Sequence, residues 1–171
     1  MSPVLTMRPT EPEDEPFLKA LRAEHDTERL FLDHLPPEME ETKKLILDSQ
    51  YAAHAHHYAN VDWDRKDCVI VVDGEPVGRF IVMQNGEEIR LADIVVSKAH
   101  RGKGIGLAVI QGIQGESMQS KRPIRLHVDR NNAALSFYQQ MGFHLLEERE
   151  THHFMEWRPP TLEDKTRHFP G

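Results

Sequence analysis

The sequence predicts an α/β protein with a mixed sheet of about seven strands flanked by helices. Apolar runs of strand length alternate along the chain with stretches whose apolar residues recur at helical spacing. The dipeptides Asp73-Gly74 and Asn85-Gly86 are typical of hairpin turns, so three consecutive strands are expected to form an antiparallel meander. The last of these strands is followed by a helix and another strand, a unit that requires parallel pairing.

The N-terminal part is expected to hold one strand and two helices. Residues 4–7 form the strand, and the acidic run 11–14 begins the first helix, because carboxylates favour the positive end of the helix dipole. Pro36-Pro37 interrupts the chain before a long helix over about 38–58. Six residues of that helix are expected to share one face: Leu45, Ile46, Ser49, Ala52, Ala53 and His56.

The remaining elements follow the turns and apolar runs. Residues 68–72 are continuously apolar, as in a strand that is buried on both faces. The later elements are strands at 77–83 and 89–96, a helix over 104–119, a strand at 124–128, a helix around Tyr138, and two antiparallel strands at 143–148 and 153–157. Gly112 and Gly115 weaken the helix over 104–119, and close packing against the sheet or a cofactor would explain them.

Length, charge and cysteine content set further bounds. With 171 residues and no linker-like segment, residues 1–171 are expected to form one domain. The net charge of −7 disfavours nucleic acid as a partner, and no apolar run reaches the length of a membrane span. The single cysteine, Cys68, excludes an intrachain disulfide, and the amino terminus lacks the pattern of a secretory signal, so a cytoplasmic location is expected.

A glycine-rich basic turn follows the strand at 89–96. It reads Arg101-Gly102-Lys103-Gly104-Ile105-Gly106 and leads into the next helix. Glycines let a ligand approach the backbone N–H groups, and the helix start and the two cations favour an anion such as phosphate. A P-loop needs a Lys-Ser/Thr pair after its last glycine, and a dinucleotide fingerprint needs a glycine or another small residue where Leu107 or Val109 stands. A simple turn and helix cap would use the same glycines.

A second pattern follows the strand at 124–128. Asn131 suits a helix N-cap, Ala134 is a small residue in the first turn, and Tyr138 lies one turn further on the same side. Gly142 then suits the C-terminal stop. An ordinary capped amphipathic helix would also place an aromatic residue at position 138.

The two segments occur in order, separated by a helix and a strand. The spacings Arg101-x-x-Gly104-x-Gly106 and Asn131-x-x-Ala134-x-x-x-Tyr138-x-x-x-Gly142-Phe143 resemble the pyrophosphate loop and the second cofactor-contacting segment of the GNAT superfamily of N-acetyltransferases. The resemblance covers residues 69–157 and is weakest over the first two helices. It implies the acyl-CoA N-acyltransferase fold. It also implies an enzyme that transfers an acetyl group from acetyl-coenzyme A to a primary amine in a ternary complex.

The resemblance also assigns roles to residues by position. In the family, the strand before the loop splays from its neighbour, and its backbone groups pair with the pantetheine arm and polarise the acetyl carbonyl. The residues implied in coenzyme A binding are Ile94, Val95, Val96, Arg101, Gly102, Lys103, Gly104, Ile105, Gly106, Asn131, Ala134, Phe137 and Tyr138.

Tyr138 stands where the family places its general acid. A tyrosine hydroxyl, with a pKa of about 10, is protonated at neutral pH and can give a proton to a thiolate whose thiol has a pKa near 8.5. Catalysis through this proton is one interpretation, and ordering the cofactor sulfur is the other. The sequence leaves both open.

The general base is less well defined. Members of the family often carry a glutamate six residues before the position of Val96, and this chain has Arg90 there, which cannot act as a base. Asp93 is the nearest carboxylate on the same strand, and Glu87 and Glu88 stand at its start. Each could act through water, and each could instead be a solvated or paired carboxylate.

The resemblance places part of the acceptor pocket on the early helices, where Gln50, His54 and Tyr58 are expected to line it. His54 and His57 lie one helical turn apart, but a third ligand at suitable spacing is missing, so no metal is expected. His127 is a further candidate near the cofactor. The expected partner is a small-molecule or peptide amine, with no nucleic acid and no membrane.

Three alternatives stay open. A non-catalytic acyl-coenzyme A binding or sensing domain would bind its ligand through the same glycine loop but catalyse no reaction. An O-acyl or larger-acyl transferase would use the same scaffold. A homodimer through the last strands would place Trp157 or Phe154 at the contact, although either could belong to the core.

Overall fold

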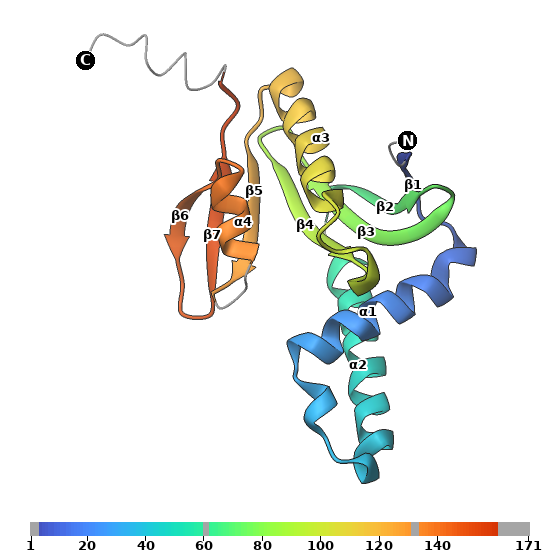
Figure 1. Ribbon diagram of the computed structural model, residues 1–171. Helices are drawn as coiled ribbons and strands as arrows, with labels where there is room; N and C mark the ends of the chain where they lie inside the picture. Colours follow the sequence, from blue (N-terminus) through green and yellow to red (C-terminus); the bar gives the residue numbers. More distant parts are fainter. Residues whose placement is uncertain (1–3, 60–61, 131–133, 161–171) are drawn as a thin grey trace, which may run out of the picture. The chain divides into compact units, whose positions relative to one another are not determined.

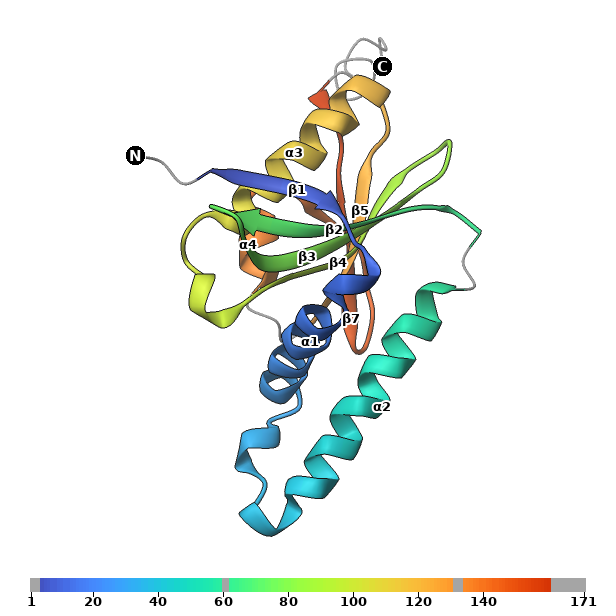
Figure 2. The ribbon, with the colours of Figure 1, turned by 90° about the vertical axis from the view of Figure 1, so that its right-hand side faces the viewer.

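The computed structural model describes residues 4–59, 62–130 and 134–160. Seven strands form one mixed sheet in the order β1-β2-β3-β4-β5-β7-β6 (Figures 1 and 2). The sheet and its flanking helices confirm the predicted fold class. Among the described residues, no helix is both long and apolar enough to cross a bilayer.

The elements follow the predicted order. The strands are β1 (Leu5–Pro9), β2 (Asp64–Val72), β3 (Glu75–Gln84), β4 (Ile89–Val96), β5 (Ile124–Asp129), β6 (His144–Glu148) and β7 (His152–Trp157). The helices are α1 (Glu15–Arg29), α2 (Glu40–Ala59), α3 (Ile105–Ser120) and α4 (Ala134–Gln140). Short 3-10 helices lie at Pro12–Asp14, Leu32–His34, Pro37–Met39 and Lys98–His100.

The chain divides into two compact units. The first comprises Met1–Trp63, Asp67–Phe80 and Ile94–Ile105, and the second comprises Asp64–Lys66, Ile81–Asp93 and Gly106–Gly171. The first unit therefore holds α1, α2 and the glycine loop, and the second holds α4 and most of α3.

In the first unit, an ion pair fixes the start of α1. Arg8 on β1 donates two hydrogen bonds of 2.8 Å to the Asp14 carboxylate, and these bonds lower the pKa of Asp14 to about 2. Leu18 and Leu21 are the buried apolar residues of α1. β1 pairs antiparallel with β2, whose Cys68, Val69 and Ile70 are buried.

The face predicted for α2 is wrong. Leu45 is 69 % exposed, and Ser49, Ala52 and His56 are exposed as well. The half-buried side chains include Leu47, Tyr51, His54 and Tyr58, which recur at steps of three or four residues on another side of the helix. Apolar and small residues are spread around α2, so packing against α1, rather than the pattern itself, selects the inner face.

In the second unit, β4 and β5 run parallel with Ile89 opposite Ile124 and Leu91 opposite Leu126. This confirms the predicted strand–helix–strand unit. β5 and β7 are antiparallel, as are β7 and β6, so β7 lies between β5 and the edge strand β6. Met155 on β7 is fully buried within this part of the core.

Close packing against the sheet does not explain the two interior glycines of α3. A Cβ atom at Gly112 or Gly115 would have no neighbour within 4 Å among the described residues. Replacing Gly112 by alanine should therefore raise the free energy of unfolding by about 0.5–1 kcal/mol, because glycine loses more backbone entropy in a helix. Urea denaturation of Gly112→Ala beside the wild type measures this gain. An unchanged or lower midpoint would contradict the prediction.

Candidate active site

Two glycines give the loop after β4 its shape. Gly102 has φ +75° and Gly104 has φ +79°, a left-handed conformation that residues with side chains rarely adopt. A Cβ atom at either would meet nothing within 4 Å in the part of the chain that the structure describes. α3 begins directly afterwards at Ile105, and the first N–H groups of a helix have no partner within it. The loop thus has the properties of a backbone anion-binding site.

The loop also folds back on the end of β4. The Ser97 N–H donates to the Val77 carbonyl at 2.8 Å, and the Ser97 hydroxyl lies 2.6 Å from His100 Nδ1. Arg101 Nε donates to the Val96 carbonyl at 3.4 Å. Of the strand residues that the sequence implied in cofactor binding, Val95 is buried, and Ile94 and Val96 are half-buried.

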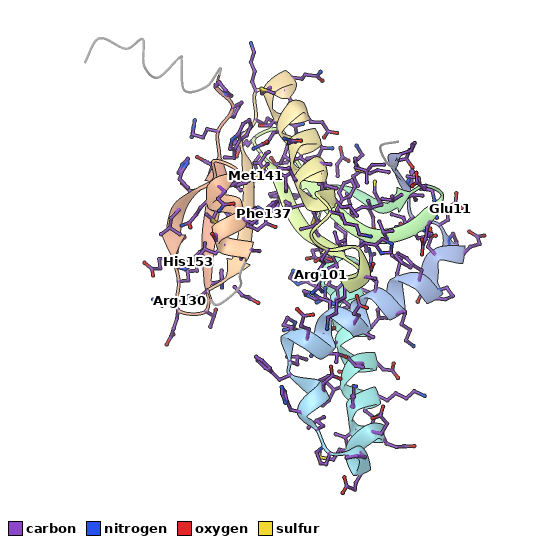
Figure 3. All side chains as sticks on the ribbon, in the orientation of Figure 1. Glu11, Arg101, Arg130, Phe137, Met141 and His153 are labelled. Carbon is purple, nitrogen blue, oxygen red and sulfur yellow. The ribbon has the colours of Figure 1, made fainter. Side chains whose placement is uncertain are left out.

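Two carboxylates of α1 contact the cationic side of this loop. Arg101, labelled in Figure 3, donates from Nη1 to both Glu28 oxygens at 2.9 and 3.0 Å. The Lys98 N–H donates to Glu24 Oε1 at 2.6 Å. The hydrogen bond from Arg101 is the main cause of a lowered pKa for Glu28. Sequence reasoning missed both glutamates, although acidic residues four apart on a helix are a signal for one charged face.

In the second unit, Tyr138 is buried on α4. Only 7 % of its surface is exposed, and the rings of Phe137 and Phe143 lie 5.4 and 5.5 Å from it, centre to centre. Burial, with a smaller effect of the negative charge of Asp93, raises the pKa of Tyr138 to about 12. The structure therefore brings the residue predicted as acid within electrostatic range of Asp93. The Tyr138 hydroxyl holds its proton at neutral pH.

The second cofactor segment is partly described. Asn131 lies outside the described residues, and Ala134 is the first residue of α4. α4 ends as predicted, because Gly142 has φ +97° and the Phe143 N–H donates to the Tyr138 carbonyl at 3.0 Å. Figure 3 labels Phe137 on this helix and Met141 directly after it. A Cβ atom at Gly106, in the first turn of α3, would lie 3.9 Å from Phe137 Cζ on α4.

Arg90 and Glu88 belong to an ionic network. Arg90 Nε donates to Glu88 at 2.9 Å, and Arg125 Nη1 donates to the other Glu88 oxygen at 3.2 Å. Arg125 also donates to the buried Glu156 at 2.9 Å. Glu88 is therefore a paired carboxylate, while Glu87 is exposed in the turn before β4.

An aromatic cluster adjoins this network on β5 and β7. Arg90 Nη1 lies 3.4 Å from His127 Nε2, and the guanidinium stands 5.1 Å from the centre of the Phe154 ring. His127 stacks on Phe154 with ring centres 4.6 Å apart. Burial first, and then the charge of Arg90, lower the pKa of His127. His127 is thus neutral at pH 7.

The three residues predicted for the acceptor pocket lie along one side of α2 in the first unit. Gln50 accepts a hydrogen bond of 3.0 Å from Arg29, and the rings of His54 and Tyr58 meet edge to face at 5.0 Å. The His57 ring also meets the Tyr58 ring edge to face, with the two ring centres 4.9 Å apart. Among the described residues, no three histidine, cysteine or acidic side chains gather as metal ligands.

Comparison with known proteins places this geometry in context. Residues 64–145, which include the glycine loop and Tyr138, match the family model of the acetyltransferase (GNAT) domain. No curated protein sequence matches the chain.

Solved acetyltransferase structures share the fold. The PaiA N-acetyltransferase of Thermoplasma acidophilum, solved in complex with coenzyme A, has a TM-score of 0.65 at 18 % identity, covering 92 % of this chain and 99 % of its own. The ribosomal-protein-S18-alanine N-acetyltransferase of Escherichia coli has a TM-score of 0.63 at 17 % identity, with coverages of 91 % and 94 %. A spermidine N-acetyltransferase chimera from Vibrio cholerae and hSSAT has a TM-score of 0.62 at 19 % identity, with coverages of 94 % and 98 %. The domain match and the shared fold agree: residues 64–145 are similar to the GNAT acetyltransferase domain, and the chain has the fold of GNAT acetyltransferases.

Proposed function

We propose that this chain, as one domain over residues 1–171, is a cytoplasmic N-acetyltransferase. It moves the acetyl group of acetyl-coenzyme A to a primary amine of a small molecule or peptide by direct attack in a ternary complex. The observation that carries the proposal is the loop after β4. There Gly102 and Gly104 adopt the left-handed conformation and carry no side chain, so a ligand can approach the backbone directly before α3. This loop lies inside the segment that matches the acetyltransferase domain.

Coenzyme A is assigned to the residues that the family pattern matches. The backbone of the glycine loop and the start of α3 receive the pyrophosphate, because N–H groups and the helix dipole favour an anion there. The backbone of Ile94, Val95 and Val96 pairs with the pantetheine arm and polarises the thioester carbonyl. α4 contributes Phe137 and Tyr138 to the same substrate.

The reaction moves protons and charge in four steps. The acceptor amine must be neutral before its lone pair attacks the thioester carbon, and Asp93 is the carboxylate that we assign to accepting this proton through water. The attack places negative charge on the carbonyl oxygen, which the β4 backbone stabilises. The nitrogen, now cationic, releases its second proton to water. The carbon–sulfur bond then breaks, and the Tyr138 hydroxyl gives its proton to the leaving thiolate and regains one from water. The raised pKa of Tyr138 keeps this hydroxyl protonated at neutral pH.

The acceptor is assigned only as an amine. Two of the structural neighbours are a spermidine N-acetyltransferase and a ribosomal-protein alanine N-acetyltransferase, which supports an amine but not one particular acceptor. Gln50, His54 and Tyr58 on α2 are assigned to the acceptor pocket, because their side chains lie together on one side of that helix.

Calorimetric titration with acetyl-coenzyme A, followed by a free-thiol assay against a panel of amines, tests the proposal. Binding together with thiol release for one class of amine is the expected result. Binding without release for any amine would favour a sensing domain instead. Failure to bind coenzyme A would contradict both functions.

Arg101 and Glu28 allow a separate test of phosphate binding. Arg101→Ala should weaken binding of coenzyme A and leave the affinity for pantetheine unchanged, because pantetheine lacks the pyrophosphate. Glu28→Gln should raise the affinity for coenzyme A by up to about fivefold, since an exposed ion pair contributes about 1 kcal/mol or less and its loss frees the guanidinium. Calorimetry with both ligands measures the two effects. Equal losses for both ligands in Arg101→Ala would show that Arg101 only ties the loop to α1.

A further inference from the structure

Gly78, a buried glycine on β3, lies close against the end of the neighbouring strand β4. A Cβ atom at Gly78 would lie 2.6 Å from the Val95 carbonyl oxygen and 3.3 Å from Val96 Cα. It would also lie 3.1 Å from Ile70 Cδ1 on β2. Contacts under 3.0 Å essentially never occur for a real Cβ atom, and the nearest neighbour here is backbone, which cannot rotate away.

The neighbouring residue ties the same strands together. The Val77 carbonyl accepts the Ser97 N–H at 2.8 Å, one residue beyond Val96. Residues 77 and 78 of β3 therefore lie against the last two residues of β4, Val95 and Val96, and against Ser97, which follows them just before the glycine loop. A glycine within a strand commonly marks such a close approach of two backbones.

From this contact we infer that Gly78 is a positioning residue for cofactor binding. Its missing side chain allows the backbone of Val95 and Val96 to lie where the proposed function needs it, against the pantetheine arm and the thioester. The inference rests on the proposed function, because it concerns the path of the same strand. Nothing in the sequence pattern around Gly78 indicates this role, since the nearest neighbours come from other strands.

Gly78→Ala tests the inference with a matched control. The added methyl group must push the Val95 carbonyl away, and a displacement of reacting groups by about 1 Å can cost roughly 10²-fold in rate. We expect the affinity for acetyl-coenzyme A and kcat both to fall. Adenosine 3′-phosphate 5′-diphosphate, the part of coenzyme A without the pantetheine arm, should bind as it does to the wild type. Gly86→Ala is the control, because a Cβ atom at Gly86 has no neighbour within 4 Å among the described residues.

A second variant separates the effect on the fold from the effect on the cofactor. Ile70→Val removes the Cδ1 atom that an alanine at position 78 would meet, so the double variant Gly78→Ala/Ile70→Val should regain part of the thermal stability that Gly78→Ala loses. Its affinity for acetyl-coenzyme A should stay low, because the Val95 carbonyl oxygen is still displaced. Ile70→Val alone should bind as the wild type does.

The outcomes separate the inference from the proposed function. Wild-type protein that fails to bind acetyl-coenzyme A overturns the proposed function. If the wild type binds, unchanged affinity and kcat in Gly78→Ala and in the double variant overturn the inference. An equal loss of acetyl-coenzyme A and the truncated nucleotide in the double variant also overturns it, because the role of Gly78 would then be general to the fold. Loss confined to the ligand with the pantetheine arm supports the inference.

Discussion

Gly104→Val is expected to abolish detectable binding of coenzyme A. A valine places three carbon atoms where the loop backbone must approach the pyrophosphate, and the β-branched side chain also resists the left-handed conformation at φ +79°. No protein atom among the described residues lies within 4 Å of the new Cβ, so the variant should fold. Calorimetric titration with coenzyme A measures the loss.

Gly74→Val is the matched control for this variant. Gly74 in the turn between β2 and β3 has φ +83°, and a Cβ atom there also has no neighbour within 4 Å in the described part of the chain. Both variants therefore carry similar backbone strain, about 1–2 kcal/mol. Gly74→Val should lose stability and keep its affinity for coenzyme A. If Gly104→Val binds as well as Gly74→Val, the loop does not hold the pyrophosphate.

Tyr138→Phe is expected to lower kcat by roughly 10²–10⁴-fold, the usual contribution of a positioned acid. The phenylalanine ring keeps the packing between Phe137 and Phe143 but has no proton for the thiolate. The affinity for acetyl-coenzyme A should therefore remain near that of the wild type. Steady-state kinetics and calorimetry on the same preparation separate the two quantities. Full activity of the variant at every pH would leave Tyr138 with a positioning role only.

The raised pKa of Tyr138 also has a consequence for stability. In the unfolded chain the hydroxyl has its usual pKa of 10.0, whereas in the folded protein the pKa is about 12. The folded state therefore keeps a proton that the unfolded state loses, and the stability that this group contributes is lost as the pH rises from about 10 to about 12. Tyr138→Phe should lose less stability than the wild type over this pH interval. Denaturant unfolding at several alkaline pH values measures the difference.

Local patterns were sufficient for most of the architecture. The Asp73-Gly74 turn, the apolar strand segment at 68–72 and the strand at 89–96 each depend on neighbours within a few residues, and the structure confirms them. The predicted face of α2 is wrong, because Leu45 and Leu47 are equally apolar and only contact with α1 decides which of them is shielded. The same limit applies to the site: the loop spacing was visible, but its pairing with Glu28, 73 positions away in the sequence, was not.

By itself, then, the sequence determined the order of strands and helices, the glycine loop and the positions that match the GNAT pattern, because these depend on residue type and short spacing. Only the tertiary structure decided that Glu24 and Glu28 contact the loop. It also decided that the charge of Asp93 raises the pKa of Tyr138 and that Gly78 lies against the Val95 backbone. Such contacts join distant parts of the chain. Their geometry follows from how strands and helices pack, which one-dimensional spacing does not encode.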